Sequence, residues 1–171
     1  NKINFLKKRF SKLNYKSLTS INLHSEEISK YSSIIAKKKK VRLILKEYQK
    51  KFAKKFKRIA IEGRDISSKI LNKDPRYDIS FFFVCNLNTA AYRRWKDLKV
   101  INEQITLHEV KKSLKKRNEL DVNRRFSPLI RAKDSITIRT DILNKKTMVD
   151  KMSKEIEKKL IKKYGRNLKA R

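Results

Sequence analysis

The sequence predicts an α/β fold in which a parallel sheet is flanked by helices and carries basic helical extensions. Two observations lead to this fold class. Short apolar runs bounded by turn residues occur at 58–61 (RIAI) and 79–84 (ISFFFV), and a half-polar run, SITIRT, occurs at 135–140. Helical patterns separate and follow these runs, and strands that alternate with helices form parallel sheets with right-handed crossovers.

The first two runs are nearly continuous in apolar residues, which is typical of strands buried on both faces of a parallel sheet. Cys85 ends the run FFFVC, so we expect a buried, inert thiol there. A single cysteine also excludes an internal disulfide and a multi-cysteine metal site. His24 and His108 lie far apart in the sequence with no cysteine partner, so we assign no metal ligand and expect no cofactor.

The N-terminal segment, residues 1–23, is ambiguous. A helical stripe accounts for Ile3, Leu6, Phe10 and Leu13, whereas short apolar pieces separated by Asn and Ser equally fit a hairpin. Ser25, followed by two glutamates, predicts a helix start, because acidic side chains are favoured at the positive end of the helix dipole. The inward face expected for this helix consists of Ile28, Tyr31 and Ile35.

Four more helices follow from the spacing of apolar residues. One begins at about residue 41, with lysines outward, and its inward positions are Ile44, Leu45, Tyr48 and Phe52. The second, at about 87–98, contains Tyr92 and Trp95. The third spans about 107–120, where Thr106 and Glu109 form a capping box. The fourth spans about 146–163, with inward positions Met148, Met152, Ile156 and Leu160.

The charge balance sets this chain apart from a typical soluble enzyme. It has 48 Lys and Arg against 17 Asp and Glu, a formal net charge of +31. Drift of an AT-rich coding sequence toward lysine is one explanation, but self-repulsion on this scale favours a polyanionic partner. Nucleic acid is the polyanionic partner that fits best, because its many phosphate groups form favourable contacts with Lys and Arg side chains. No membrane partner is expected, since no long uncharged apolar stretch occurs.

Five short motifs follow one another between about residues 21 and 163. They are Asn22-Leu23-His24-Ser25-Glu26-Glu27-Ile28; Val41, Arg42, Leu45 and Gln49; Glu62-Gly63-Arg64-Asp65-Ile66; Tyr92-Arg93-Arg94-Trp95; and Arg117, Asp121 and Arg124 leading into Ser127-Pro128-Leu129. In this order and spacing they resemble the bacterial-type cytidylate kinase family. The resemblance implies an incomplete P-loop nucleoside-monophosphate-kinase-like sheet.

The resemblance also implies that Arg64, Asp65, Arg117, Asp121 and Arg124 help to bind CMP and neighbouring phosphates. At the carboxyl edge of a parallel sheet, Arg64 would grip a phosphate and Asp65 would accept hydrogen bonds from a base amino group. The alternative is a purely structural ion-pair network in which Arg64, with Asp65 or Asp121, positions loops.

The sequence departs from the family where phosphates are held. It contains no G-x-x-x-x-G-K-[ST] loop, whose backbone amides and lysine cradle the phosphates of ATP. The family's Gly-Thr after Gly-Arg-Asp-Ile is replaced by Ser67-Ser68, and Leu120 and His24 stand where the family has arginine. The strand that feeds the family's phosphate loop lies between those corresponding to 58–61 and 79–84. We therefore expect a gap in the sheet that upstream residues or a separate chain would fill.

The broken kinase pattern and the charge together lead to one hypothesis. The protein would be a non-catalytic, RNA-binding structural component of a ribonucleoprotein, in particular a mitochondrial ribosome, derived from cytidylate kinase. Its partners would be ribosomal RNA and neighbouring ribosomal proteins. The expected RNA-binding residues are Lys37, Lys38, Lys39, Lys40, Lys50, Lys51, Lys54, Lys55, Lys57, Arg58, Lys162, Lys163, Arg166, Lys169 and Arg171.

Two other functions remain open. In the first, the chain is the C-terminal part of an active cytidylate kinase that transfers phosphate from ATP to CMP. The phosphate loop would then lie on a missing or separate segment, and Arg93 or Arg94 would close over ATP. In the second, the chain is a basic accessory protein that binds free RNA or DNA. We expect residues 1–24 to be a remnant of the monophosphate-binding insert or a basic arm, 25–163 to be the kinase-like domain, and 164–171 to be a basic tail.

Overall fold

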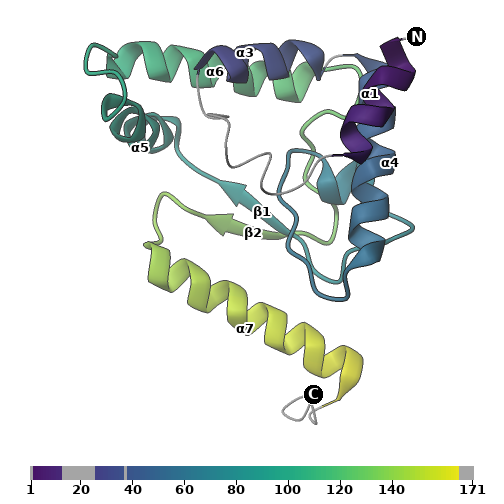
Figure 1. The fold of residues 1–171 in the computed structure, drawn as a ribbon. Coiled ribbons are helices and arrows are strands. Elements are labelled where there is room, and N and C mark those ends of the chain that lie inside the picture. Colours follow the sequence, from purple (N-terminus) through teal and green to yellow (C-terminus); the bar gives the residue numbers. More distant parts are fainter. Residues whose placement is uncertain (1, 13–25, 37, 166–171) are drawn as a thin grey trace. The chain divides into compact units, whose positions relative to one another are not determined.

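The computed structural model describes residues 2–12, 26–36 and 38–165 (Figure 1). The chain divides into two compact units. The first consists of Asn1–Arg76 and Glu119–Ile130, and the second of Tyr77–Asn118 and Arg131–Arg171. The boundaries expected at residues 24/25 and 163/164 stay predictions.

The first unit is helical. It contains α1 (Lys2–Ser11), α3 (Glu26–Ile35), α4 (Lys39–Lys55) and a five-residue π-helix, η1 (Ile66–Ile70). The N-terminal segment is therefore a helix, not a hairpin, over the residues of α1; residues 13–25, including Ser25, lie outside the described residues.

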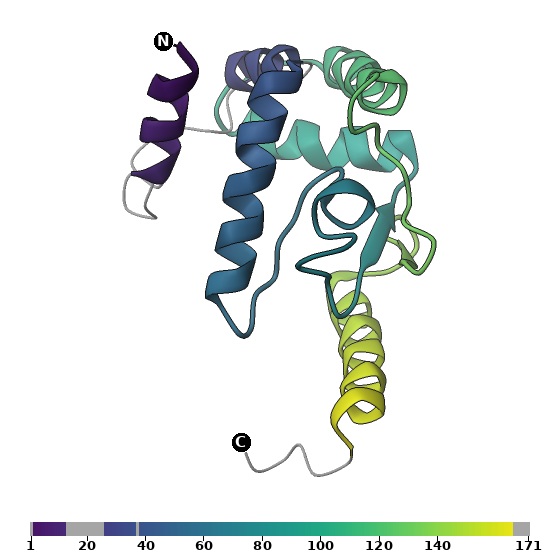
Figure 2. The ribbon, with the colours of Figure 1, turned by 90° about the vertical axis from the view of Figure 1, so that its right-hand side faces the viewer.

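Aromatic rings hold α1 against α4, and the two helices lie side by side in Figures 1 and 2. The ring centroids of Phe10 and Tyr48 are 6.4 Å apart. Along α4 the contacts continue from Tyr48 to Phe52 at 6.4 Å and from Phe52 to Phe56 at 4.9 Å. Aromatic side chains therefore form a row along one face of α4, as the spacing of its apolar residues predicts.

Two expectations for the first unit are wrong. Residues 58–61 form no strand, and Ile59 is 40% exposed. An apolar run becomes a strand only where a neighbouring strand completes its backbone hydrogen bonds, and within the described part of the chain this run pairs with no strand. The faces expected to be inward are also more open than their pattern suggests, since Tyr31 is 57% and Phe52 43% exposed. Periodicity shows which residues share a face, not whether anything covers it.

The second unit contains a two-stranded parallel sheet, in which β1 (Phe81–Val84) pairs with β2 (Ile136–Arg139). The register aligns Phe81 with Ile136 and Val84 with Arg139. Figure 1 shows the two arrows side by side. The α/β fold class with parallel strands and flanking helices is thus confirmed.

Three helices accompany the sheet: α5 (Leu87–Lys99), α6 (Leu107–Asn123), whose last turn belongs to the first unit, and α7 (Lys145–Tyr164). Their predicted positions are confirmed, with ends that differ by at most three residues. The capping box is also confirmed: the Thr106 backbone N–H donates to Glu109 Oε2 at 2.9 Å, and the Glu109 N–H donates to Thr106 Oγ1 at 3.2 Å. Local capping chemistry therefore fixes where α6 begins.

The small core of the second unit is formed by Ile138, Ala91 and Val110, which are 0%, 0% and 3% exposed. The expectation that the run at 79–84 is buried on both faces is wrong, because Phe83 is 50% exposed. Cys85 is exposed as well, so its thiol is not the buried, inert group expected. Burial of this short strand is therefore incomplete, since Phe81, Phe82 and Val84 are half-buried. No helix among the described residues is both long and apolar enough to cross a membrane.

Candidate functional site

Five charged side chains from three parts of the first unit form one cluster, here called the Arg/Asp cluster. Helix α4 contributes one arginine, the turn before η1 contributes an Arg-Asp pair, and the end of α6 with the following loop contributes the rest. The members are Arg42, Arg64, Asp65, Asp121 and Arg124.

Arg42 and Asp65 form the first ion pair of the cluster, through Nη2 and Oδ2. Both side chains are nearly buried, with 15% and 10% of their surface exposed. Arg42 Nη1 also donates a hydrogen bond to the carbonyl oxygen of Ala36 at 3.2 Å. The guanidinium therefore ties the end of α3 and the start of α4 to the turn that carries Asp65.

Asp121 lies between two arginines. Its Oδ1 accepts a hydrogen bond from Arg124 Nη1 at 3.0 Å, and its Oδ2 is 3.3 Å from Arg64 Nε. The second contact is an ion pair without hydrogen-bond geometry, so the buried Oδ2 has no hydrogen-bond donor among the described residues. The Arg64 side chain is 38% exposed, whereas that of Arg124 is 7% exposed.

The loop after α6 wraps around Arg124. Arg124 Nε donates to the carbonyl oxygen of Ser127, whose φ of 51° lies in the left-handed region. The backbone N–H of Leu129 donates to the carbonyl oxygen of Asp121 at 2.8 Å and closes the loop. The loop that contains Ser127-Pro128-Leu129 thus fixes the position of the Arg124 side chain.

The Arg/Asp cluster has an excess of positive charge, because three guanidinium groups face two carboxylates. Burial lowers the pKa of Arg124, and the charge of Arg42 lowers it further, while Asp121 and Asp65 act in the opposite direction. Arg124 Nη2 is buried and has no hydrogen-bond acceptor among the described residues. Because buried donors are almost always paired, this group indicates a place for an anionic ligand.

Gly63 allows the turn before the cluster to close tightly. A Cβ at this position would lie 2.7 Å from Ile66 Cγ1, closer than side-chain atoms normally approach. The carbonyl oxygen of Asp65 then accepts from the N–H groups of Lys69 and Ile70, at 2.9 and 3.2 Å, and starts η1. A glycine between an apolar run and an Arg-Asp pair is needed here for space.

The structure brings together four of the five site residues predicted from the sequence, namely Arg64, Asp65, Asp121 and Arg124. The fifth, Arg117, lies exposed on α6, one helical turn before Asp121, and takes no part in these ion pairs. Sequence reasoning did not identify Arg42 as a site residue. An arginine on the same helical face as Leu45 is the signal that was missed, since a charge on the inward face of a helix needs a partner.

The side chains expected to bind RNA are scattered along α4 and the end of α7, and several have partners within the chain. Lys54 pairs with Asp74 at 2.7 Å, and Lys163 pairs with Asp78. The Lys39 ammonium lies 5.4 Å from the centroid of the Phe126 ring. Four members of the set lie outside the described residues: Lys37, Arg166, Lys169 and Arg171. Within the described part of the chain, no three His, Cys, Asp or Glu side chains gather to hold a metal ion.

Parallel strands with flanking helices, together with a Gly-Arg-Asp turn that feeds a buried Arg/Asp cluster, define an α/β protein of the nucleoside-monophosphate-kinase type. The cytidylate kinase family model matches residues 1–158. The chain therefore belongs to the cytidylate kinase family, and the resemblance noted in its motifs is confirmed.

Individual relatives agree with the family match. A cytidylate kinase of Clostridium tetani is 34% identical over 142 residues, which cover 83% of this chain and 59% of that protein. A cytidylate kinase of Mesomycoplasma hyopneumoniae is 31% identical over 138 residues, or 81% of this chain and 59% of that protein. A bifunctional pantoate ligase/cytidylate kinase of Prochlorococcus marinus is 38% identical over 131 residues, or 76% of this chain and 25% of that protein.

These findings overturn the hypothesis of a non-catalytic ribosomal component with ribosomal RNA and ribosomal proteins as partners. The relatives carry the name of an enzyme, and nothing in the comparisons points to a ribosome. The hypothesis treated the missing phosphate loop as a loss of function, but the chain spans about 59% of the length of the Clostridium tetani relative, so this absence says nothing about catalysis. The mitochondrial location stays a prediction.

Proposed function

We propose that the protein is an active cytidylate kinase, which transfers a phosphoryl group from ATP to CMP, and that the Arg/Asp cluster binds CMP. The observation that carries the proposal is the buried Nη2 of Arg124, which has no hydrogen-bond acceptor among the described residues and lies in a cluster with one more positive than negative charge. The relatives named as cytidylate kinases supply the reaction.

The phosphate of CMP would lie against the arginines. Arg64 is the most exposed arginine of the three, at 38%, so a ligand can approach its guanidinium from solvent, while Arg124 is fixed by Asp121 and Ser127. Guanidinium groups bind phosphate oxygens through paired N–H donors, which fixes orientation as well as position. Because phosphoryl transfer depends mainly on alignment and on neutralising charge, such a grip is itself a catalytic contribution.

The cytosine amino group would donate a hydrogen bond to the Asp65 carboxylate. Arg42 occupies Oδ2 of this carboxylate, so Oδ1 is the oxygen that accepts from the base. Arg42 thereby fixes the orientation of the Asp65 carboxylate, which would recognise the base. On the ATP side, Arg93 donates from Nη2 to the carbonyl oxygen of Thr140 at 2.8 Å, so closing over ATP would require it to release this contact.

Calorimetric titration of CMP, cytidine and UMP into the chain tests the binding site directly. We expect CMP to bind more tightly than cytidine, which lacks the phosphate, and than UMP, which lacks the amino group. Arg64→Gln should weaken CMP binding about tenfold or more, the loss expected for one charged hydrogen bond. Lys116→Gln, the same charge change at an exposed position of α6, should leave CMP binding unchanged.

Catalysis is tested by measuring CMP-dependent ADP formation from ATP with the protein purified from its native source. A protein that binds CMP at the cluster but forms no ADP would refute the activity and keep the site. A protein that neither binds CMP nor forms ADP in its presence would refute the whole proposal.

A further inference from the structure

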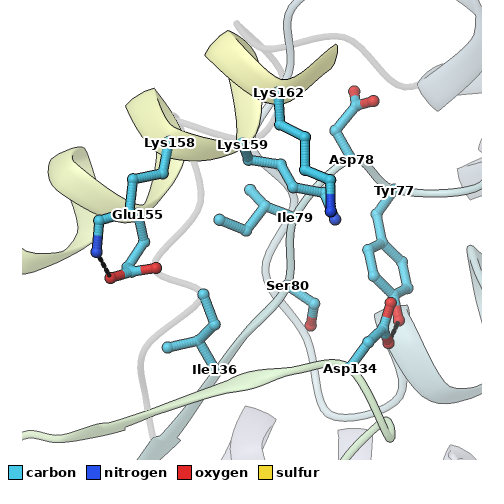
Figure 3. Close-up of a pocket in the computed structure, with 10 residues that line it drawn as sticks. All are labelled: Tyr77, Asp78, Ile79, Ser80, Asp134, Ile136, Glu155, Lys158, Lys159 and Lys162. Atoms are coloured by element: carbon cyan, nitrogen blue, oxygen red, sulfur yellow. Dashed lines mark hydrogen bonds and ion pairs between the residues drawn. The ribbon is translucent and has the colours of Figure 1, made fainter.

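A cavity of about 230 Å³ lies in the second unit, and none of the residues assigned to CMP lines it. Its walls are one face of α7 near the helix end and the segments that lead into β1 and β2 (Figure 3). In sheets of this type substrates bind beyond the carboxyl ends of the strands. This cavity lies at the amino ends, so it is a different place on the fold.

Every carboxylate in the cavity already has a partner. Glu155 accepts from Lys158 at 3.0 Å, and Asp78 pairs with Lys163, which lies outside the lining. Asp134 accepts from the hydroxyl group of Tyr77. The acidic side chains are therefore committed to contacts within the protein.

Two lysines of the cavity take no part in these contacts. Among the residues that the structure describes, neither Lys159 nor Lys162 makes an ion pair. Figure 3 shows both side chains extending from α7 across the cavity toward the segment that carries Tyr77 and Asp78. Ile79 and Ile136 line the cavity beside the two lysines, which are themselves exposed and so accessible to an anion from solvent.

We propose that this cavity binds a small molecule through its phosphate group, held between Lys159 and Lys162. Two ammonium groups match the charge of a phosphate monoester, which carries about −1.5 to −2 at pH 7. The ammonium group is a compact charge well suited to phosphate oxygens. The shared chemistry is the phosphate group, which either a nucleotide or inorganic phosphate can supply.

Lysine acylation followed by mass spectrometry tests the proposal at the level of single residues. The chain is acylated in sodium chloride alone and with inorganic phosphate, CMP or cytidine added at equal ionic strength. At a ligand concentration ten times the dissociation constant, the free site is about a tenth of the total, so acylation of Lys159 and Lys162 should slow about tenfold. Lys151 and Lys154, exposed on the same helix but outside the cavity, serve as internal controls.

Comparing the added ligands distinguishes a nucleotide from inorganic phosphate as the source of the phosphate group. Protection by inorganic phosphate and CMP alike, without protection by cytidine, assigns the site to a phosphate group of either origin. Protection by CMP alone narrows the ligand to a nucleotide. Protection that persists in Arg64→Gln, whose CMP site is weakened, shows that this cavity is independent of the Arg/Asp cluster.

Two results would overturn the proposal. Equal slowing at Lys151, Lys154, Lys159 and Lys162 would mean diffuse screening of a basic helix. The second result concerns a variant with Lys159→Gln and Lys162→Gln. If that variant has a lower melting temperature but releases the same heat on titration with inorganic phosphate, the two lysines only support the negative end of the α7 dipole.

Discussion

Replacing Asp121 by asparagine should destabilise the first unit more than any exposed charge change. The carboxylate is 11% exposed and faces the buried Arg124 and the half-exposed Arg64, so its loss raises the charge of the Arg/Asp cluster from +1 to +2. Removing one partner of a buried ion pair costs about 3–5 kcal/mol. The amide oxygen of asparagine still accepts from Arg124 Nη1, and Arg64 reaches solvent. We therefore expect the lower end, about 3 kcal/mol.

Urea unfolding measures this loss as a change in the free energy of unfolding. Glu119→Gln is the matched control, since it makes the same charge change at an exposed position on the same helix, and we expect it to cost less than about 0.5 kcal/mol. A double variant that adds Arg124→Gln to Asp121→Asn should cost less than the sum of the single changes, because the two side chains interact directly. Equal stabilities of Asp121→Asn and Glu119→Gln would refute the view that the cluster is held by buried charge pairing.

Three further predictions concern single features. Gly63→Ala should destabilise the protein by about 1–3 kcal/mol because of overpacking against Ile66, and Ile66→Ala in the same chain should relieve most of this loss in urea unfolding. The Thr106 hydroxyl hydrogen bond keeps the pKa of Glu109 below its ordinary value of 4.5. The stabilisation is therefore complete above about pH 4.5 and is lost as the pH falls through the folded pKa; an NMR titration of Glu109 should show its midpoint rising toward 4.5 in Thr106→Ala. Cys85 should react with one equivalent of a thiol reagent in the native protein at a rate near that of the unfolded chain, whereas slow, unfolding-limited labelling would contradict its exposure.

The helices were predictable from the sequence because their signals are local. The Thr106 and Glu109 pair defines the start of α6 through hydrogen bonds that span three residues, and no other part of the chain is needed to form them. The absence of a strand at 58–61 was not predictable, because a strand is completed by a neighbour that its own residues do not specify. The same limit explains Cys85, whose apolar run indicates burial without showing which side of the strand is covered.

Most of the candidate site followed from motif spacing, and the remainder required three dimensions. Arg64, Asp65, Asp121 and Arg124 stand in motifs whose order matches a family, so their proximity could be inferred. The pairing itself could not: Asp65 bonds to Arg42 from α4, and Arg64 faces Asp121. Which arginine meets which carboxylate depends on the packing of helices that lie far apart in the sequence. Net charge was the most misleading cue, since +31 describes the whole surface and identifies no partner.

The parallel pairing of β1 and β2 has a consequence for how the second unit folds. Aligned residues such as Phe81 and Ile136 are separated by 136 − 81 = 55 positions, so their contact closes a long loop. The entropic cost of closing a loop of this length is about 3.5 kcal/mol above its constant term. Helices α5 and α6 form within that loop from local contacts and shorten the chain to be closed. We therefore expect strand pairing to be the late, slow step, with the sheet edge completed only after the helices between its strands have formed.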